Sequence, residues 1–319
     1  MTGPGPPDAE LVARALEQDR FAVAQLVSLF EDRRPTAMER RARVLEAAEV
    51  HPRRHSATVF GITGTPGCGK STLLSRVVPD LLAFREELTV AILAVDPSST
   101  ISGGALLGDR TRMKLEHDEP RLFFRSQASD TQLGGLSPST FRVCRLLSRL
   151  FDCVFVETVG VGQSEDDVRS VADKTFLVLQ PHGGDEVQFL KAGIMETPDA
   201  FVLNKCDDPS TERGYHQLRS SLWLARPFDA DEVPIFKTSA KTGVGVAELV
   251  ASLAAHLAAE PSRRPERRDA LFLERWVREE WGRAGSRFLE VLGGAEHHVR
   301  VSGGVERAQV QFELRFREG

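Results

Sequence analysis

Short, almost continuously apolar runs alternate with longer amphipathic segments through the middle of the chain. Such runs are typical of strands buried on both faces of a sheet, and the segments between them have apolar residues at helical spacing. Strands are predicted at Thr58–Ile62, Val90–Val95, Leu122–Phe124, Cys153–Val156, Thr175–Leu179, Ala200–Leu203 and Pro234–Lys237. Helices are predicted at Ser71–Leu82, Ser137–Leu150, Glu165–Ala172, Tyr215–Leu224 and Val246–Leu257. This alternation predicts an α/β fold with a doubly wound, mostly parallel sheet.

The chain before this region has a helical pattern throughout. Apolar residues recur at helical spacing from Asp8 to Ala48, and Asp19 and Pro35 interrupt them. Two or three helices are therefore predicted, and we assign residues 1–55 to a helical N-terminal extension.

The chain after the alternating region changes pattern again. Leu271–Leu292 predicts one more helix, and from Val299 to Arg317 apolar and polar residues alternate around Gly303-Gly304. That alternation is typical of a two-stranded hairpin. We therefore expect a central α/β domain over residues 56–260, followed by a C-terminal helix and hairpin over 261–319 that serves as a dimerisation or partner arm.

Composition limits the classes of protein that fit this chain. Its 319 residues are 41% hydrophobic and 27% charged, as in ordinary globular domains, and the formal net charge is −5. No apolar run approaches the roughly 20 residues of a membrane-spanning helix, and no broad basic field favours nucleic acid. The cysteines are scattered and the first ten residues do not resemble a signal peptide. We therefore expect a cytoplasmic protein that binds neither membranes nor nucleic acids.

A glycine-rich segment follows the first predicted strand and precedes a helix. It contains G-x-x-x-x-G-K-S, in the structural context that a P-loop requires. Its backbone amides can surround phosphates, Lys70 can reach the β- and γ-phosphate oxygens, and the Ser71 hydroxyl can coordinate Mg²⁺. The candidate phosphate ligands are Gly64, Thr65, Pro66, Gly67, Cys68, Gly69, Lys70, Ser71 and Thr72.

A second motif follows the strand predicted at Ala200–Leu203. It reads N-K-x-D and lies at the carboxyl end of its strand, where open α/β sheets bind ligands. A carboxylate at Asp207 can accept from the ring N–H and the exocyclic amine of guanine, whereas adenine lacks this pair of donors. The motif therefore predicts GTP rather than ATP. The candidate guanine ligands are Asn204, Lys205, Asp207, Ser239, Ala240 and Lys241.

Three acids and a glycine complete the candidate site. An apolar strand ends at Glu157, and the amide of Gly160 is placed to meet a γ-phosphate. Another strand is followed by Asp96, and Asp109 lies in the loop beyond it. Asp96 and Asp109 are candidate ligands of Mg²⁺ or its waters, although Asp96 could instead cap a turn and Asp109 could be a solvated loop acid. We expect the catalytic groups to be Lys70, Asp109, Glu157 and Gly160.

The ordered set of motifs resembles the MeaB/ArgK/MMAA GTPases. Besides the P-loop and N-K-C-D, the resemblance is carried by V-D-P-S-S-T (95–100), G-D-R-T-R-M (108–113), L-G-G (133–135) and E-T-V-G-V-G-Q-S-E (157–165). It extends from about residue 8 to about residue 260. Each motif is common among P-loop proteins, but this order of motifs is specific.

The resemblance implies a Mg²⁺-dependent GTPase that is a chaperone for an adenosylcobalamin-dependent acyl-CoA mutase, such as methylmalonyl-CoA mutase. Such a chaperone gates loading of the cofactor and protects the mutase. The resemblance also implies a homodimer, the adenosyltransferase as a further partner, and a switch loop at Gln180–Lys191. It assigns Mg²⁺ to Ser71, Asp96, Asp109 and Glu157. The family ends in a helical dimerisation arm, from which the predicted hairpin departs.

The expected reaction is slow GTP hydrolysis by in-line attack of water, because no glutamine occupies the usual water-positioning place. One alternative is a nickel-insertion GTPase, although His and Cys residues do not cluster in the sequence. Another is a scaffold that senses the nucleotide without hydrolysing it. Phosphate release and metal titration distinguish these three functions.

Overall fold

The computed structural model describes residues 8–34, 36–96, 119–128, 136–158, 164–181, 195–259 and 265–318. The chain forms two compact units. The sheet unit contains residues 58–136 and 152–260, and the helical unit contains residues 1–57, 137–151 and 261–319. Segments remote in sequence thus combine, because the helical unit takes its members from both ends of the chain and from its middle.

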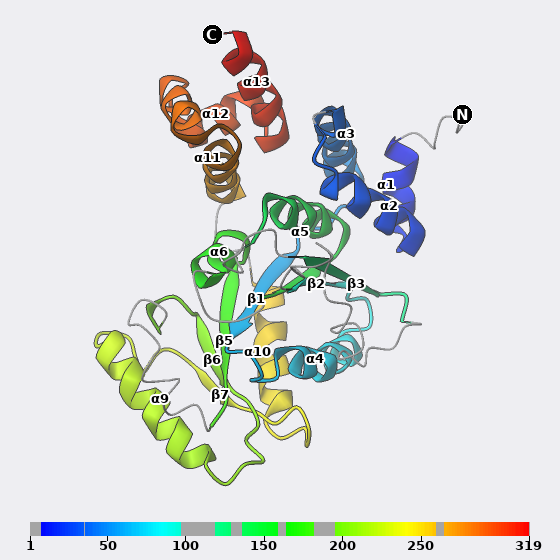
Figure 1. Cartoon of the computed structure of the whole chain (residues 1–319). Helices are drawn as coiled ribbons and strands as arrows, with labels where there is room; N and C mark the ends of the chain where they lie inside the picture. Colours follow the sequence, from blue (N-terminus) through cyan, green and yellow to red (C-terminus); the bar gives the residue numbers. More distant parts are fainter. Residues whose placement is uncertain are drawn as a thin grey trace, which may run out of the picture. The chain divides into compact units, whose positions relative to one another are not determined.

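Seven strands form a parallel sheet in the order β3-β2-β4-β1-β5-β6-β7 (Figure 1). They are β1 (Thr58–Gly64), β2 (Val90–Asp96), β3 (Leu122–Ala128), β4 (Cys153–Glu157), β5 (Lys174–Leu179), β6 (Ala200–Leu203) and β7 (Ile235–Lys237). The chain passes to one side of β1 for β2–β4 and to the other for β5–β7. Such a switch point is where open α/β sheets bind ligands, at the carboxyl ends of the strands.

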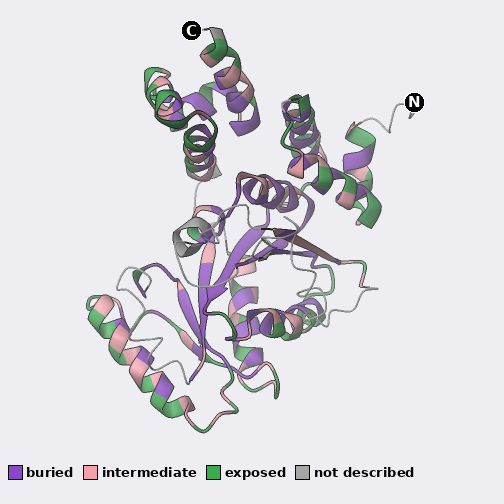
Figure 2. Ribbon diagram, in the orientation of Figure 1, coloured by how far each residue is buried: buried purple, intermediate pink, exposed green. Residues whose placement is uncertain are grey.

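Within the described residues, four helices accompany the sheet: α4 (Lys70–Phe84), α6 (Ser164–Val171), α9 (Thr211–Ala225) and α10 (Val246–Ala258). Successive side chains of a strand point to opposite faces. Phe176 and Val178 of β5 accordingly join a core with α4 and α10, whereas Leu177 and Leu179 join a second core with α9. The inner strands β2, β4, β1, β5 and β6 are buried along most of their length (Figure 2), as their continuous apolar sequence predicts, whereas the edge strands β3 and β7 are only partly buried.

The predicted doubly wound parallel fold is confirmed, and most element ends lie within a few residues of their expected positions. The predicted strand Ala200–Leu203 is β6 without change, whereas α9 begins at Thr211 rather than at Tyr215. Among the described residues, no helix has the length and apolar character that crossing a membrane requires.

Aspartates accept backbone N–H groups at the amino end of the sheet. Asp152, Asp173 and Asp199 each directly precede a strand. Their Oδ2 atoms accept the backbone N–H groups of Thr89 (2.9 Å), Val59 (2.8 Å) and Thr175 (2.8 Å), respectively. Each carboxylate therefore binds the amide at or next to the start of a neighbouring strand, and an amide left unpaired there would cost stability.

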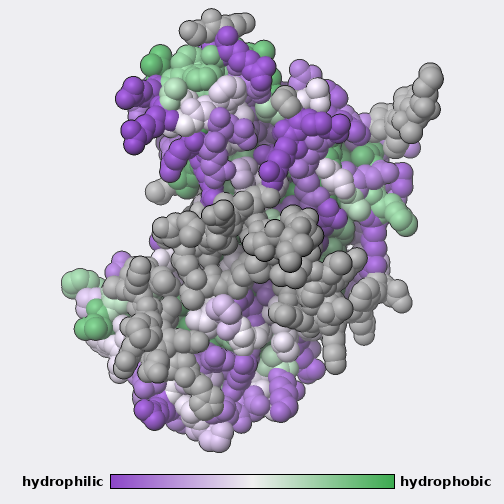
Figure 3. Space-filling model, viewed as in Figure 1, coloured by the Kyte–Doolittle hydropathy of each residue, from purple (hydrophilic) through white to green (hydrophobic). Residues whose placement is uncertain are grey.

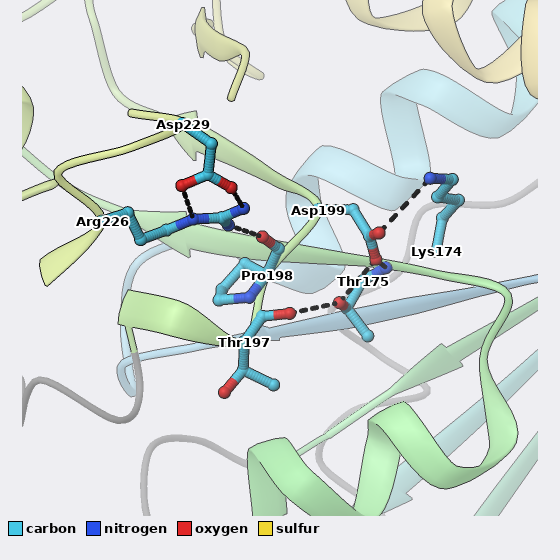
Figure 4. Close-up of polar contacts among 7 residues, drawn as sticks. All are labelled: Lys174, Thr175, Thr197, Pro198, Asp199, Arg226 and Asp229. Atoms are coloured by element: carbon cyan, nitrogen blue, oxygen red, sulfur yellow. Dashed lines mark hydrogen bonds and ion pairs between the residues drawn. The ribbon is translucent and has the colours of Figure 1, made fainter. Parts of the chain in front are cut away.

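An arginine holds the loop after α9 to the residues that lead into β6 (Figure 4). Arg226 Nη1 donates to the Pro198 carbonyl (2.9 Å), and its Nε donates to Asp229 (3.1 Å). The neighbouring Asp199 pairs with Lys174 (3.3 Å). Apolar residues gather on the surface over the C-terminal end of α9 (Figure 3), where Leu224 and Phe228 are 87% and 99% exposed.

The helical unit has seven helices within the described residues. They are α1 (Asp8–Leu16), α2 (Arg20–Glu31), α3 (Thr36–Val50), α5 (Pro138–Leu150), α11 (Pro265–Val291), α12 (Gly294–Ser302) and α13 (Val305–Glu318). Asp19 caps α2, since its Oδ1 accepts from the backbone N–H groups of Phe21 (2.9 Å) and Ala22 (3.2 Å). The two or three helices predicted for the N-terminal extension are three.

The hairpin predicted at Val299–Arg317 is wrong, because this segment is helical. Gly303 has a φ of 74° and ends α12, so the Gly-Gly pair joins two helices rather than two strands. The buried Val305, Ala308 and Phe312 follow helical spacing. Phe312 packs against Trp276 of α11 at a ring distance of 5.9 Å. The helical C-terminus also removes the expected departure from the MeaB/ArgK/MMAA pattern.

Three arginines at helical spacing on α5 contact four other helices of this unit. Arg142 Nε donates to the Phe30 carbonyl of α2 (3.1 Å), and burial lowers the pKa of Arg142 to about 10. Arg145 pairs with Asp269 of α11 (3.1 Å) and with Glu306 of α13, and Arg149 pairs with Glu49 of α3 (2.8 Å). α5 is therefore the element on which both terminal segments assemble.

Candidate nucleotide site

The P-loop connects β1 to α4 at the carboxyl edge of the sheet (Figure 1). Gly69 precedes α4 with a φ of 93°, and a Cβ placed there would lie 2.7 Å from Asn204 Nδ2. At Gly64 a Cβ would lie 2.0 Å from the Val178 carbonyl oxygen. Both positions therefore require glycine, which keeps the loop backbone close to the neighbouring strand ends.

Lys70 is only 7% exposed and lies against its own loop. Its Nζ donates to the carbonyls of Gly64 (2.8 Å) and Thr65 (3.3 Å). These bonds satisfy a buried ammonium group, and they hold it over the loop whose amides would surround a phosphate. Around it, Cys68 is buried, whereas Pro66, Gly67 and Thr72 are exposed.

Two predicted metal ligands meet beside Lys70. Ser71 Oγ, in the first turn of α4, donates to Glu157 Oε1 at the end of β4, at 2.6 Å. Glu157 is 5% exposed, and it pairs in register with Ile62 of β1. A hydroxyl and a carboxylate are hard oxygen ligands, which Mg²⁺ prefers, so these two residues fit a Mg²⁺ site.

Asn204 links three segments of the site. Its Nδ2 donates to the Cys68 carbonyl of the P-loop (2.9 Å). Its Oδ1 accepts from the Ala240 backbone N–H (3.2 Å) and from Thr238 Oγ1 (3.3 Å), in the loop after β7. Asn204 is 1% exposed, so these bonds are protected from competition with water. The phosphate loop and the two loops of the guanine motif are thereby held together.

The side chain of Asp207 is exposed and ionised. Ser239 Oγ donates to its Oδ1 at 2.7 Å, and this hydrogen bond is the main reason that the pKa of Asp207 is lowered. An exposed carboxylate with one oxygen already oriented can accept from the N–H groups of a guanine ring. Lys241, the last residue of the predicted guanine loop, is also exposed.

Lys205 makes a contact that the motif alone does not predict. It has a positive φ of 63°, and its Nζ donates to Gln180 Oε1 at 2.8 Å. Gln180 follows β5 and begins the predicted switch loop, so this hydrogen bond joins the guanine motif to the described start of that loop. The roles of Asn204 and Gln180 as links between loops have no sequence signal, because their partners are at least 25 residues away.

The structure describes only some of the other predicted site residues. Asp96 is the last residue of β2, at the same carboxyl edge as Glu157. Asp109, Gly160 and most of the predicted switch loop lie outside the described residues. The described part of the site thus brings together the P-loop, the end of β4, the N-K-C-D motif and residues 239–241.

Comparison with known proteins agrees with this geometry. The family model described as "Methylmalonyl Co-A mutase-associated GTPase MeaB" matches residues 23–281. A Pyrococcus horikoshii protein with a provisional GTPase name is 43% identical over 247 residues, which are 76% of this chain and 75% of that protein. GTPase ArgK of Escherichia coli is 37% identical over 247 residues, 76% of this chain and 73% of that protein.

A solved structure supports the fold. The crystal structure of a protein described as LAO/AO transport system kinase aligns with 99% of this chain and all of its own, with a TM-score of 0.64 and 24% identity. At this identity the likeness concerns the fold alone. The family match and the identities to named GTPases carry the assignment, and the P-loop and N-K-C-D geometry agrees with it. This chain belongs to the MeaB family of GTPases.

Proposed function

We propose that this chain hydrolyses GTP to GDP and phosphate with Mg²⁺, and that it is a chaperone for an adenosylcobalamin-dependent acyl-CoA mutase. Nucleotide binding rests chiefly on the bonds of Asn204 to Cys68 and Ala240. A nucleotide bound along the carboxyl edge would contact the P-loop with its phosphates and Asp207 with its base. Because one buried side chain ties these loops together, both ends of GTP meet groups whose spacing is set before binding.

Each group of residues in the proposed site would have its own role in binding GTP and Mg²⁺. Lys70 leaves its carbonyl partners for the β- and γ-phosphate oxygens, and the P-loop amides of residues 64–72 bind the remaining oxygens. Ser71 and Glu157 would hold Mg²⁺, with Asp96 and Asp109 as further ligands of the ion or its waters. When bound, Mg²⁺ supplies positive charge that stabilises the transferring phosphoryl group.

The attacking water would be positioned beside the γ-phosphate, where Gly160 donates its amide. No glutamine stands in the usual water-positioning place in the sequence around Gly160. Intrinsic turnover should therefore be slow and should rise when a partner orders the surrounding loops.

The chaperone role is supported by the family description, which names association with methylmalonyl-CoA mutase. By this proposal the nucleotide state gates loading of adenosylcobalamin into the mutase and protects it afterwards. Residues 180–191 would carry the signal to the mutase, and the hydrogen bond between Lys205 and Gln180 would connect them to the guanine motif. A homodimer in the cytoplasm, with the adenosyltransferase as a second partner, completes the proposal.

Calorimetry with GTP and ATP, each with Mg²⁺, tests nucleotide recognition. We expect GTP to bind at least about ten-fold more tightly, because Asp207 can pair with two donors of guanine. Equal affinities would contradict the assignment of Asp207. A parallel titration with Ni²⁺ alone tests the alternative of a nickel-insertion GTPase, which would be expected to bind Ni²⁺ strongly.

Phosphate release from GTP, measured with and without methylmalonyl-CoA mutase and its cofactor, tests hydrolysis and partnership separately. Slow release that the mutase accelerates is expected. Tight GTP binding without any release would indicate the non-hydrolysing scaffold instead. Release that no acyl-CoA mutase changes would retain the GTPase and remove the chaperone role.

A further inference from the structure

The chain that leaves β4 is held to β1 one residue beyond the last strand pair. β4 pairs with β1 and β2 as far as Glu157, which lies opposite Ile62 and Ala94. Beyond that pair, the Thr158 backbone N–H donates to the Ile62 carbonyl at 3.0 Å. The Thr158 hydroxyl also donates to Thr63 Oγ1 of β1 at 3.1 Å. Two hydrogen bonds therefore fix the residue that directly follows the candidate Mg²⁺ ligand Glu157.

Glu157 and Thr158 are anchored on opposite faces of the sheet, because successive side chains of an extended chain alternate. On one face, Glu157 accepts a hydrogen bond from Ser71 of α4. On the other face, the Thr158 hydroxyl meets Thr63. The end of β4 is thus attached to α4 by one residue and to β1 by the next.

The pair of hydroxyl groups is shielded from water. Thr63 and Thr158 are 2% and 1% exposed. Gly61, two residues before Thr63 and on the same face of β1, lies so close to α6 that a Cβ there would be 2.1 Å from Val168 Cγ1. α6 therefore packs tightly against this face of β1. Because water does not reach the pair, removing one hydroxyl leaves the other without this hydrogen bond.

The shape of these two side chains does not explain why both carry a hydroxyl. Valine and threonine are both β-branched and nearly equal in shape, so valine could fill either position. The hydrogen bond adds a direction, since it holds the chain after β4 at one place along β1. A shift of that chain would move the carboxylate of Glu157 relative to Ser71, and Mg²⁺ requires its oxygen ligands in near-ideal octahedral positions.

We propose that Thr63 and Thr158 are positioning residues for the Mg²⁺ site, and that their hydrogen bond keeps the Glu157 carboxylate beside the Ser71 hydroxyl. Both threonines act through Glu157, from the opposite face of the sheet. The inference rests on the proposed function, from which it takes the Mg²⁺ site of Ser71 and Glu157. It extends that site to two residues that belong to none of the sequence motifs' assigned ligands.

Calorimetry of GDP binding, with Mg²⁺ and with EDTA, tests the proposal without measuring turnover. The ratio of the two affinities gives the gain from Mg²⁺. In Thr158→Val, which loses the hydroxyl and keeps the shape, we expect the affinity in EDTA to equal that of wild type. We expect the gain from Mg²⁺ to fall about three- to ten-fold, as for the loss of one buried hydrogen bond. Thr63→Val should have the same effect, whereas Thr158→Ser, which keeps a hydroxyl, should retain most of the wild-type gain.

Thr175→Val is the matched control. Thr175 is also 2% exposed, and its Oγ1 donates to Asp199 Oδ2 at 3.0 Å, at the amino end of the sheet. The control therefore loses a buried threonine hydrogen bond at the end of the sheet opposite to Glu157. We expect its urea midpoint to fall and its gain from Mg²⁺ to match that of wild type.

An unchanged gain from Mg²⁺ in Thr158→Val would overturn the positioning role and leave the Mg²⁺ site intact. Where Thr158→Val does not fold, Thr63→Val decides the question in the same way. An equal loss of gain in Thr175→Val would show that any loosening of the sheet weakens Mg²⁺ binding, which also contradicts the proposal. If GDP binding by the wild type does not respond to Mg²⁺, the site of Ser71 and Glu157 is itself wrong, so this failure is distinct from the others.

Discussion

The two ends of the same sheet use polar side chains in opposite ways. At the amino end, Asp152, Asp173 and Asp199 accept backbone amides of neighbouring strands, so these carboxylates are part of the sheet's own hydrogen bonding. At the carboxyl end, the side chains of Lys70 and Asp207 bond to groups of nearby loops. A ligand can take over the bonds of the second kind but not those of the first.

The two ends therefore differ in what their side chains are expected to support: the amino end stabilises the sheet, and the carboxyl end offers groups to a ligand. Removing an amino-end carboxylate leaves an unpaired backbone amide, so the loss should appear as lower stability. Removing a carboxyl-end side chain leaves the strands intact, so the loss should appear in nucleotide binding or turnover. Four substitutions test this contrast between the two ends of the sheet.

Lys70→Ala should reduce the rate of phosphate release from GTP by about 100- to 1,000-fold, because the charge that meets the β- and γ-phosphates is lost. Steady-state phosphate assays give the rate, and circular dichroism checks that the fold survives. As a comparison, Lys241→Ala removes the positive charge of an exposed residue in the guanine loop, at a distance from the phosphates. Unchanged turnover in Lys70→Ala would remove the P-loop assignment.

Asp207→Asn should weaken GTP binding by about ten-fold or more and should reduce the preference for GTP over ATP. The lowered pKa of Asp207 keeps the wild-type carboxylate ionised at neutral pH, so the variant removes a full charge. Competition calorimetry with the two nucleotides measures both effects. The neighbouring Asp208→Asn is the matched control, and equal losses in both variants would argue against base recognition by Asp207.

Asp173→Ala should lower the free energy of unfolding by about 1–3 kcal/mol, because the Val59 amide loses a buried carboxylate partner. Urea denaturation measures this, and hydrolysis per folded molecule should stay near the wild-type rate. Exposed Glu232→Ala, also an acid-to-alanine change, should cost little. A large loss of turnover in folded Asp173→Ala would break the contrast between the two ends.

Arg226→Ala should lower stability by less than Asp173→Ala, since Arg226 and Asp229 are partly solvent-accessible. The hydrogen bond from Arg226 lowers the pKa of Asp229 below its ordinary value of 3.8. The pair therefore stabilises the fold above that value and loses its effect as pH falls through the lower, folded pKa. Urea midpoints should differ from wild type at neutral pH and converge in strong acid; a difference that grows with acidity would contradict this sign.

Much of the site could be predicted from local residue order. The P-loop and N-K-x-D residues follow strands whose apolar runs are nearly continuous, so the strand ends, and with them Lys70 and Asp207, could be assigned directly. The hairpin error came from the same kind of reasoning. Between Val299 and Phe316 alternate apolar residues satisfy a period of two, but Val305, Ala308 and Phe312 also satisfy a helical period.

Packing decided between those two periods. The ring of Phe312 stacks on Phe316 at 5.6 Å and meets Trp276 of α11, and a helix brings residues i and i+4 this close, whereas a strand would separate them by about 13 Å. Short-range periodicity carries no information about a partner that lies 36 residues away in the chain. For the same reason, periodicity could not predict the contacts of the three α5 arginines, because their carboxylate and carbonyl partners come from α2, α3, α11 and α13.

Residue order alone therefore predicts the seven strands of the sheet and their parallel arrangement and names the candidate phosphate and guanine ligands, although it mistakes the C-terminal helices for a hairpin. Three-dimensional assembly establishes the rest: the link through Asn204, the carboxylate caps at the amino end, and the grouping of both terminal segments with α5. The physical reason is the separation along the chain over which each kind of interaction acts. Propensity and motif chemistry act between residues a few positions apart, whereas a buried polar group obtains its partners from whatever segment the fold brings within about 3 Å.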